Sequence, residues 1–412
     1  MVKKVEKIEL LAPAGDFEKL ETALHFGADA VYFAGKNYGL RAYAANIEDD
    51  DLAKAVSLVH KHGKKAYVTL NIFAHNKDFE NLAAYLKVLV KAKVDAVIVS
   101  DIGMFSFIRE HEPSLVIHVS TQANTTNAYS ANMWAKMGAK RIILARELSL
   151  TEIEEICKAL PEGVEVECFV HGAMCISYSG RCLLSNYLTG RDSNHGECVQ
   201  ACRWHYSLVE DTRPDEKLDI EEDSHGAYIL NSKDLCLIDY LDKLKKAGVT
   251  SFKVEGRMKS PYYVATVINA YRRAINLLET SDKKYVVPAS IKNELNKASH
   301  RKYTTGFFLG DDKLIKQNYE SASQDQESVF IAKVISANGN KLVVEQRNKF
   351  SVGDSLEVLS SGESFNKKVK ILKIENEKGE EQQVAKLVQE KLIVTIDKNN
   401  GILNGDILRA DK

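Results

Sequence analysis

The chain has 412 residues, of which 45% are hydrophobic and 27% are charged. These proportions are those of an ordinary globular protein, and the length is sufficient for one large domain and one smaller domain. The formal net charge of −1 provides no bulk attraction to nucleic acid or to an anionic membrane, although a basic face could still be balanced by acidic residues elsewhere.

The amino-terminal residues MVKKVEKIELLAPAG lack the apolar core of a signal peptide, and no apolar run in the sequence reaches the length of a membrane span. We therefore expect a cytoplasmic protein with no membrane partner. Because thiols stay reduced in the cytoplasm, the seven cysteines argue for metal binding or catalysis and against a disulfide framework.

The first 280 residues alternate short apolar runs with amphipathic stretches of helical length. Eight runs are typical of buried parallel strands: Ile8–Ala12, Ala30–Ala34, Ala66–Leu70, Ala96–Ser100, Val116–Val119, Arg141–Ala145, Val164–Val170 and Ser251–Val254. Examples of the helical stretches are Phe17–Phe26, Asp51–Lys61, Asn81–Lys91 and Ala128–Met137. This alternation predicts an α/β fold, a closed TIM-like (β/α)8 barrel over residues 1–280.

The remaining residues differ in pattern from the barrel. Pro261 fits the first position of a helix that runs to about Leu278, and residues 281–328 predict a helical extension and linker, with a second helix near Ala289–Lys297 and a polar tract at 317–328. From Val329 onward apolar residues alternate with period two between turn sequences such as NGN and NNG. We therefore expect a small all-β barrel domain at residues 329–412.

In a barrel of this kind the functional groups come from the carboxyl ends of the strands and from the loops that follow them. The polar and turn-forming residues that we expect there are Glu9, Pro13–Gly15, Tyr32, Gly35, Asn71, Asp101, His118, Gln122, Glu147, His171, Glu255 and Arg257. The barrel mouth is therefore the expected location of the site.

The segment Glu167–Trp204, here called the cysteine segment, contains five of the seven cysteines, at positions 168, 175, 182, 198 and 202. A sixth, Cys236, follows within the phrase NSKDLC. Small and turn-forming residues dominate between the cysteines, so the segment cannot form a core of its own. Since it comes directly after the seventh predicted strand, we expect a lid over the barrel mouth whose shape is fixed by a thiolate-bound metal or metal cluster.

The spacing Cys175-x6-Cys182-x15-Cys198-x3-Cys202 helps to choose between metals. Zinc sites usually contain paired C-x2–4-C knuckles, which only Cys198 and Cys202 match. Wide, unequal spacing favours an iron–sulfur cluster held by four thiolates, with zinc and simple burial of small side chains as the alternatives. Cys157 is expected in a helix core, and Cys168, within a strand, fits either role.

Four further residues are candidates for catalysis: His171, His118, Glu255 and Arg257. His171 precedes the cysteines, and its alternative role is that of a hydrogen-bonded structural residue. His118 and Gln122 form a polar segment that could instead cap a helix. Glu255 and Arg257 could close the barrel as an ion pair, or the arginine could hold a carboxylate or phosphate.

Several segments resemble the collagenase-like peptidases of unknown catalytic type, family 32 (peptidase U32). These segments are ECFVHGAMCISYSGRCLLS, LLAPAGDFEKLETALHFGADAVYFAG, STQANTTN and FKVEGRMKSPYYVATVINAYR. The resemblance extends over residues 5–310, and the carboxy-terminal β domain is similar to that of the longer bacterial members.

The resemblance implies a role in tRNA modification, namely oxygen-independent hydroxylation of the wobble uridine to 5-hydroxyuridine, with prephenate as a co-substrate. Relatives hydroxylate a ribosomal-RNA cytidine or, as a paired complex with a four-cysteine [4Fe-4S] site, ubiquinone. Carried over by position, the cluster ligands are Cys175, Cys182, Cys198 and Cys236, with Cys202 as the alternative fourth ligand. The implied partners are tRNA, the small aromatic acid prephenate and a paralogous protein.

The residues leave two other functions as alternatives. The family name implies a peptidase, but the sequence contains neither an H-E-x-x-H nor a G-x-S-x-G motif. A thiol protease needs one low-pKa cysteine beside a histidine, a part that Cys175 and His171 could take while leaving the other cysteines unexplained. The third alternative is a non-catalytic subunit that carries the cluster within a hydroxylation complex.

Overall fold

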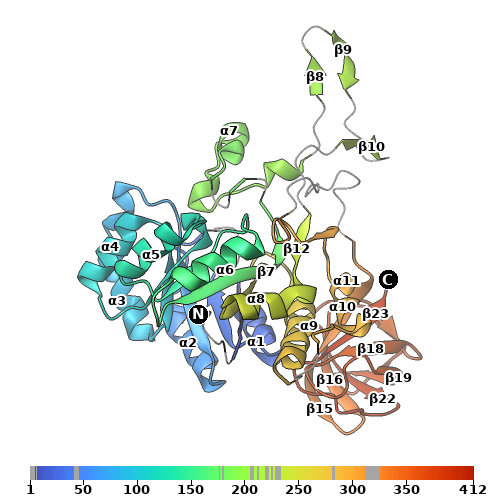
Figure 1. The fold of residues 1–412 in the computed structure, drawn as a ribbon. Helices are drawn as coiled ribbons and strands as arrows, with labels where there is room; N and C mark the ends of the chain where they lie inside the picture. Colours follow the sequence, from blue (N-terminus) through green and yellow to red (C-terminus); the bar gives the residue numbers. More distant parts are fainter. Residues whose placement is uncertain are drawn as a thin grey trace.

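A computed structural model describes residues 5, 7–40, 46–175, 177–178, 181–204, 208–210, 213–218, 222–223, 226–227, 233–280, 284–310 and 325–412. The chain forms a closed α/β barrel and a carboxy-terminal β domain that packs against one side of it (Figure 1). The cysteine segment lies over one end of the barrel, with α7 above the barrel in the view.

The predicted (β/α)8 barrel is confirmed. Its eight parallel strands pair in the order β1 to β7 and then β13, which pairs with both β7 and β1 and so closes the ring. The strands are β1 Glu9–Pro13, β2 Ala30–Phe33, β3 Lys65–Leu70, β4 Ala96–Val99, β5 Ile117–Val119, β6 Arg141–Ile143, β7 Glu165–Ala173 and β13 Ser251–Val254. The largest departure from expectation is β7, which continues beyond Val170 to Ala173.

Helices surround the barrel where the amphipathic stretches predicted them: α1 Phe17–His25, α2 Leu52–Lys61, α3 Leu82–Ala92, α4 Ile102–His111, α5 Ala128–Lys136, α6 Leu150–Ala159, α8 Leu241–Ala247 and α9 Pro261–Thr280. Side-chain caps fix their starts: Asp16 accepts a hydrogen bond from the Lys19 N–H, and Asn127 accepts one from the Ser130 N–H. Four of them end in glycines with left-handed dihedrals, which are Gly27, Gly63, Gly138 and Gly248.

Buried charges fill the end of the barrel opposite the cysteine segment. The Arg141 guanidinium is 2% exposed and pairs with the carboxylates of Glu9 at 2.5 Å, Glu165 at 2.6 Å and Glu167 at 3.0 Å. Burial raises the pKa of the Glu9 carboxyl, but Arg141 and hydrogen bonds from Tyr67 and Ser251 more than offset this effect, so the pKa is lowered. Glu9 is therefore a charged member of the barrel floor.

The prediction that Glu9 lies at the barrel mouth is wrong. Glu9 is the first residue of β1, so it lies at the amino end of the strand, whereas the mouth is formed by the carboxyl ends. The tract Pro13–Gly15 at the other end of β1 does follow the strand toward the mouth, where a β-carbon on Gly15 would lie 2.7 Å from the Arg257 carbonyl oxygen.

Beyond the barrel strands, the cysteine segment and its continuation contain α7 Leu184–Thr189, the short helices η4 Ser193–His195 and η5 Ala201–Arg203, and the strand pairs β8 Leu208–Glu210 with β9 Arg213–Leu218 and β10 Glu222–Asp223 with β11 Gly226–Ala227. The chain then returns through β12 Asp234–Cys236, which runs antiparallel to β7 and pairs with β14 Tyr303–Thr304. A buried ion pair of 2.8 Å between Asp234 and Arg301 holds this return strand in place.

The helical extension contains α10 Ala289–Lys292 and α11 Glu294–Lys297, so the predicted second helix is divided at Asn293. The division is slight, since Asn293 keeps right-handed helical dihedrals. Most of the predicted linker at 317–328 lies outside the described residues, but its last residue, Ser328, already begins β15.

The predicted all-β barrel is present after this linker. Strand β18 pairs with both β23 and β19, which closes the order β18-β23-β15-β16-β22-β19, and β20 extends it. The strands are β15 Ser328–Asn338, β16 Lys341–Gln346, β18 Ser355–Leu359, β19 Lys368–Asn376, β20 Glu381–Gln382, β22 Lys391–Ile396 and β23 Ile407–Asp411, beside the pair β17 Phe350–Ser351 and β21 Val384–Ala385.

Helix α9 joins the two domains because it is buried on nearly all of its faces. Tyr262 stacks on Phe330 of the β domain at 5.6 Å between ring centroids, and Tyr271 lies against β7 with its hydroxyl 2.8 Å from the Val170 carbonyl oxygen. Within the described part of the chain, no helix is both long enough and apolar enough to cross a bilayer.

We predict that Arg141→Gln destabilises the barrel by about 3–5 kcal/mol, because it leaves the buried Glu9 carboxylate without its cation and removes one of the two cations that contact Glu167. Urea unfolding followed by tryptophan fluorescence measures this effect selectively, since both tryptophans of the chain, Trp134 and Trp204, lie outside the β domain. The exposed neighbour Lys140→Gln is the matched control. Equal midpoints for the two variants would contradict a stabilising role for this network.

Candidate functional site

A pocket opens at the carboxyl ends of the barrel strands, beneath the cysteine segment. It encloses about 1210 Å³ of empty space, part of which is open to solvent. Its lining combines thiols, cations, amides and apolar side chains, among them Tyr32, Thr69, Asn71, Gln122, Arg146, Phe169, Met174, Cys175, Cys182, Cys198, Cys202, Arg203, Lys253, Glu255 and Arg257. The expected location of the site is thus the location of this pocket.

Four cysteines line the pocket together: Cys175, Cys182, Cys198 and Cys202. Burial raises the pKa of the Cys202 thiol, Arg203 opposes this shift, and the other three thiols add to it. All four cysteines come from the part of the cysteine segment that follows β7. The geometry therefore supports Cys202, the alternative fourth ligand, as the partner of the other three.

Cys236 does not line this pocket, contrary to the expectation that it joins Cys175, Cys182 and Cys198. It lies in β12 opposite His171 of β7, and its Sγ is 3.8 Å from the Tyr271 hydroxyl of α9. Burial raises the pKa of this thiol to about 11. The physical reason is the strand pairing, which directs Cys236 toward α9 and away from the barrel mouth.

The spacing of the four pocket thiols bears on what they could hold. No three of their sulfur atoms lie within 4.8 Å of one another. A single tetrahedral zinc ion with Zn–S bonds of about 2.3 Å would require sulfur–sulfur separations of about 3.8 Å. As they stand, no three of these thiols are close enough together to bind a single zinc ion, and four cysteines are a donor set found in iron–sulfur clusters and in structural zinc sites.

Backbone amides already face two of these sulfurs. The Leu184 N–H lies 3.4 Å from the Cys182 Sγ, and the Gln200 N–H lies 3.4 Å from the Cys198 Sγ. N–H groups aimed at sulfur stabilise thiolate charge. Two of the four pocket sulfurs therefore already have a backbone donor directed at them.

Cationic side chains form the barrel side of the pocket. The Lys253 ammonium is buried and lies 2.9 Å from the Glu167 carboxylate; burial lowers its pKa and Glu167 opposes that shift. Arg146 pairs with the Glu255 carboxylate at 2.9 Å, and the Arg257 guanidinium donates to the Thr69 hydroxyl at 3.1 Å. These three cationic side chains, two of them already paired with carboxylates, are groups of the pocket that could contact an anionic ligand.

Two aromatic rings lie directly beneath these cations. The Arg146 guanidinium is 3.8 Å from the centroid of the Phe169 ring, and the Lys253 ammonium is 4.3 Å from that of Tyr32. Such contacts fix the direction of each cation while leaving an apolar surface beside it. The wall can therefore contact both a carboxylate and a flat ring.

Glu255 and Arg257 lie in the pocket as predicted, but they do not pair with each other. Glu255 pairs with Arg146 instead. Its backbone approaches Gly172 so closely that a β-carbon there would lie 2.6 Å from the Glu255 carbonyl oxygen, and Gly172 also has a φ of +109°. The glycine of the HGA sequence is thus required for the cysteine segment to leave β7 at this angle.

The two predicted catalytic histidines do not line the pocket. His118 points into the barrel one layer below the mouth, packed edge-on against Tyr67 at 4.8 Å, and burial lowers its pKa well below the usual range. His171 is turned toward α9, where its ring contacts Tyr271 at 5.3 Å, and burial lowers its pKa to about 3. Both are therefore neutral interior residues, and His171 is not oriented as a base for Cys175.

Lys253 and Arg146 are the pocket residues that sequence analysis missed. Lys253 stands in an otherwise apolar strand, and a lone lysine at an inward position of a barrel strand is a usable signal. Arg146 is the third residue after β6, and the residue expected at the mouth from the sequence is its neighbour Glu147. Glu147 does not line the pocket, and burial raises the pKa of its carboxyl.

Comparison with known proteins gives consistent matches. The model of "Peptidase family U32" matches residues 15–318, and that of "Peptidase family U32 C-terminal domain" matches residues 326–409. The "tRNA hydroxylation protein P1" of Bacillus subtilis is 40% identical over 85% of this chain and 83% of its own length. The "tRNA hydroxylation protein P" of Escherichia coli is 39% identical over 92% and 91%. A "Collagenase" of Porphyromonas gingivalis is 30% identical over 99% of both chains.

We predict that anaerobically purified protein loses most of its iron and acid-labile sulfide when Cys175, Cys182, Cys198 or Cys202 is replaced singly by Ala. Cys236→Ala keeps the iron content of the unmodified protein, because its sulfur faces α9. Colorimetric iron and sulfide assays measure both quantities. Loss of iron in Cys236→Ala with retention in Cys202→Ala would reverse the assignment of the fourth ligand.

Proposed function

The chain belongs to peptidase family U32, and we propose that it is an enzyme that hydroxylates tRNA, forming 5-hydroxyuridine from the wobble uridine without molecular oxygen. The observation that carries the proposal is the meeting of four cysteines with a cationic wall at the carboxyl end of the barrel. Relatives named for tRNA hydroxylation, each matching most of this chain, support the substrate class.

In this proposal Cys175, Cys182, Cys198 and Cys202 hold a [4Fe-4S] cluster. Such a cluster, when bound, supplies redox chemistry that no side chain provides. The protein's own contribution is the shape and charge of the pocket. The four thiols come from a segment with few apolar residues, so binding of the cluster would also stabilise the folded conformation of that segment.

The cationic wall is proposed to bind the carboxylates of prephenate, the co-substrate. Arg146 and Arg257 carry forked guanidinium groups that suit carboxylates, and Lys253 adds a third positive charge between them and the barrel interior. Phe169 provides an apolar surface beside Arg146 for the ring of the acid. Burial strengthens these electrostatic contacts because little water competes for them.

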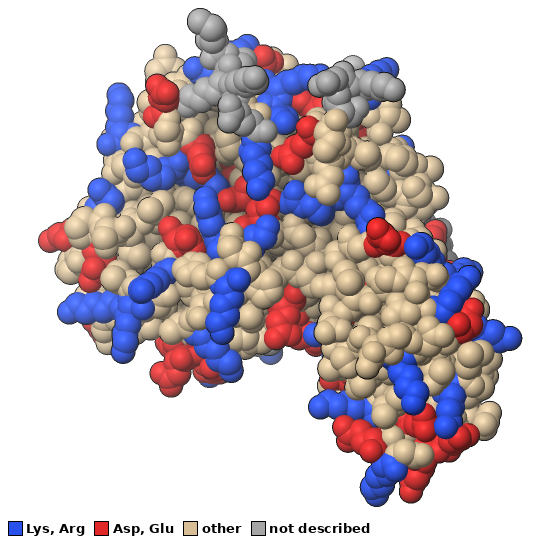
Figure 2. All heavy atoms as spheres, turned by 90° about the horizontal axis from the view of Figure 1, so that it is seen from below, with Lys and Arg blue, Asp and Glu red and all other residues tan. Residues whose placement is uncertain are grey.

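RNA is proposed to approach from the side of the cysteine segment. A uridine must leave its stack to enter a pocket, and exposed aromatic rings help to hold unstacked bases. In the cysteine segment Tyr178, Tyr187 and Trp204 are 50%, 86% and 42% exposed. By contrast, the underside of the molecule mixes acidic and basic side chains without an extended basic field (Figure 2).

A peptidase is the less favoured function. One relative bears the name "Collagenase", but among the described residues no histidine lines the pocket, and His171 faces Tyr271. A non-catalytic subunit that acts with a paralogous partner would retain the cluster ligands but would not depend on the cationic wall. Replacing the cations of the wall therefore distinguishes the two: it should lower the activity of an enzyme but leave a non-catalytic subunit functional.

We predict that expressing this chain in a bacterium that lacks its own wobble-uridine hydroxylases restores 5-hydroxyuridine and its derivatives in tRNA. Cys182→Ala, which removes a proposed cluster ligand, abolishes the restoration. Nucleoside mass spectrometry of purified tRNA is the measurement. An unmodified wobble uridine in cells that contain the folded, iron-loaded protein would refute the proposal.

We predict that Arg257→Ala lowers the restored 5-hydroxyuridine by about 10- to 100-fold, the loss expected when a hydrogen-bonded charge is removed from a binding site. Its iron content stays unchanged, because Arg257 contacts Thr69 and no cysteine in the hydrogen bonds of the described residues. Arg109→Ala, on an exposed helix end, is the matched control. Full activity of Arg257→Ala would exclude this residue from ligand binding.

A further inference from the structure

A group of metal-ligating side chains lies apart from the four thiols, on the line where the cysteine segment meets the barrel. The imidazoles of His75 and His195 and the carboxylate of Asp192 bring one ligand atom each to within 4.8 Å of the others. His75 precedes η2 (Asn76–Phe79) in the connection after β3, whereas Asp192 and His195 belong to the cysteine segment. Segments more than one hundred residues apart therefore contribute to one site.

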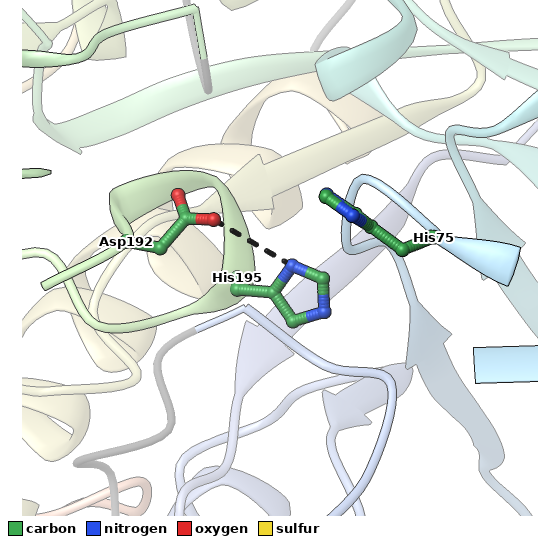
Figure 3. Close-up of side chains that lie close together, drawn as sticks. All are labelled: His75, Asp192 and His195. Atoms are coloured by element: carbon green, nitrogen blue, oxygen red, sulfur yellow. Dashed lines mark ion pairs between the residues drawn. The ribbon is translucent and has the colours of Figure 1, made fainter. Parts of the chain in front are cut away.

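The three side chains converge on a common point (Figure 3). The Nδ1 edge of His195 faces Asp192, with Nδ1 3.7 Å from the Asp192 Oδ2, and the ring of His75 stands on the other side of His195. The two imidazole rings meet edge-on with centroids 5.3 Å apart. The other carboxylate oxygen of Asp192 accepts the Asn194 N–H at 2.8 Å, so Oδ2 is held toward His195.

A second carboxylate lies behind the ring of His195. The Asp78 Oδ2 is 3.2 Å from the His195 Nε2 and accepts a hydrogen bond of 2.7 Å from the His75 N–H. A histidine that ligates a metal through one ring nitrogen usually presents the other to a carboxylate, which orients the ring. Asp78 has this position, and it also ties the backbone of His75 to the same arrangement.

We propose that His75, Asp192 and the Nδ1 of His195 form a binding site for one divalent transition-metal ion, with zinc as the best match, and that Asp78 orients His195. Two imidazoles and a carboxylate form a ligand set that zinc and neighbouring metals favour. Tetrahedral zinc with bonds of about 2.0 Å needs ligand atoms about 3.3 Å apart, so each pair of ligand atoms must approach by at most about 1.5 Å to close the site. His75 is exposed and can make that movement.

The bound ion would fasten the cysteine segment to the barrel. The Phe73 N–H already donates to the Asn194 carbonyl oxygen at 3.1 Å, and Arg181 stacks over the Phe73 ring at 4.7 Å. The Ser193 hydroxyl donates to the Cys182 carbonyl oxygen at 2.5 Å, which links the site to a pocket thiol. Metal binding here would thus order the part of the segment between Cys182 and Cys198.

An ion pair without metal is the competing explanation, in which a charged His195 bridges Asp78 and Asp192. In that explanation the side chain of His75 caps η2, where it accepts a hydrogen bond from the Asp78 N–H. In both explanations the His195 Nε2 has the Asp78 carboxylate 3.2 Å away without a hydrogen bond in the part of the chain that the structure describes, so this nitrogen does not separate them. His195→Arg distinguishes the two, because arginine keeps the charge and removes the ligand.

Cobalt(II) is the probe for the test, since cobalt bound to thiolates shows sulfur-to-metal charge-transfer bands that cobalt bound to nitrogen and oxygen lacks. The full-length protein is dialysed against cobalt chloride, and bound cobalt is counted by elemental analysis. We expect His75→Phe, His195→Arg and Asp192→Asn each to lose one equivalent of cobalt while any charge-transfer bands stay unchanged. The control is His62→Phe, which changes an exposed histidine at the end of α2, and we expect it to bind as much cobalt as the unmodified protein.

Asp78→Asn provides a graded test, because loss of an orienting carboxylate usually weakens metal binding by about 10- to 100-fold without abolishing it. Circular dichroism tests whether each variant is folded. If another variant unfolds, the amount of cobalt bound by Asp192→Asn decides, because this substitution changes a partly exposed side chain without changing its shape. Equal cobalt in the unmodified protein, His75→Phe and Asp192→Asn would overturn the proposal.

Discussion

The buried carboxylate of Glu167 connects the floor of the barrel to the wall of the pocket. One of its oxygens lies 3.0 Å from the Arg141 guanidinium, and the other lies 2.9 Å from the Lys253 ammonium. The carboxylate itself has no exposed surface, so both cations are fixed by it within a low-dielectric interior. The direction of Lys253, and with it the charge of the pocket, depends on this interaction.

Strand β7 connects this buried interaction of Glu167 to the pocket. Glu167, Phe169 and Ala173 face the barrel interior and the pocket, while Cys168 and Val170 are buried on the outer side. The part of the cysteine segment that follows Ala173, the last residue of β7, then brings four thiols to the same pocket. One strand therefore places the anion that holds Lys253, the ring beneath Arg146 and the start of the thiol-bearing segment.

The barrel and the β domain could be predicted from sequence because their signals are local. Period-two and helical patterns mark the elements, and strict alternation of strands and helices leaves few closed topologies. Side-chain direction at strand ends was harder to predict. Three polar residues near strand ends show this. His118 lies one layer below the mouth, His171 faces α9, and Glu9 stands at the opposite end of its strand.

The choice between candidate cluster ligands also could not be predicted from sequence, because it depends on side-chain direction. Spacing and family resemblance left Cys202 and Cys236 as alternatives, and only the antiparallel pairing of β12 with β7 directs Cys236 away from the mouth. Arg146 was missed because the turn after β6 directs residue 146, and not residue 147, into the pocket. The His75 site was invisible for a related reason, since its ligands come from distant segments with no shared motif.

Anomalous X-ray scattering at the iron absorption edge, from crystals of anaerobically purified protein, tests the central claim most directly. We expect a single cluster of iron atoms at the barrel mouth, bonded to the sulfur atoms of Cys175, Cys182, Cys198 and Cys202, with no iron at Cys236. Iron bonded to Cys236, or a lone zinc ion among the pocket thiols, would contradict it.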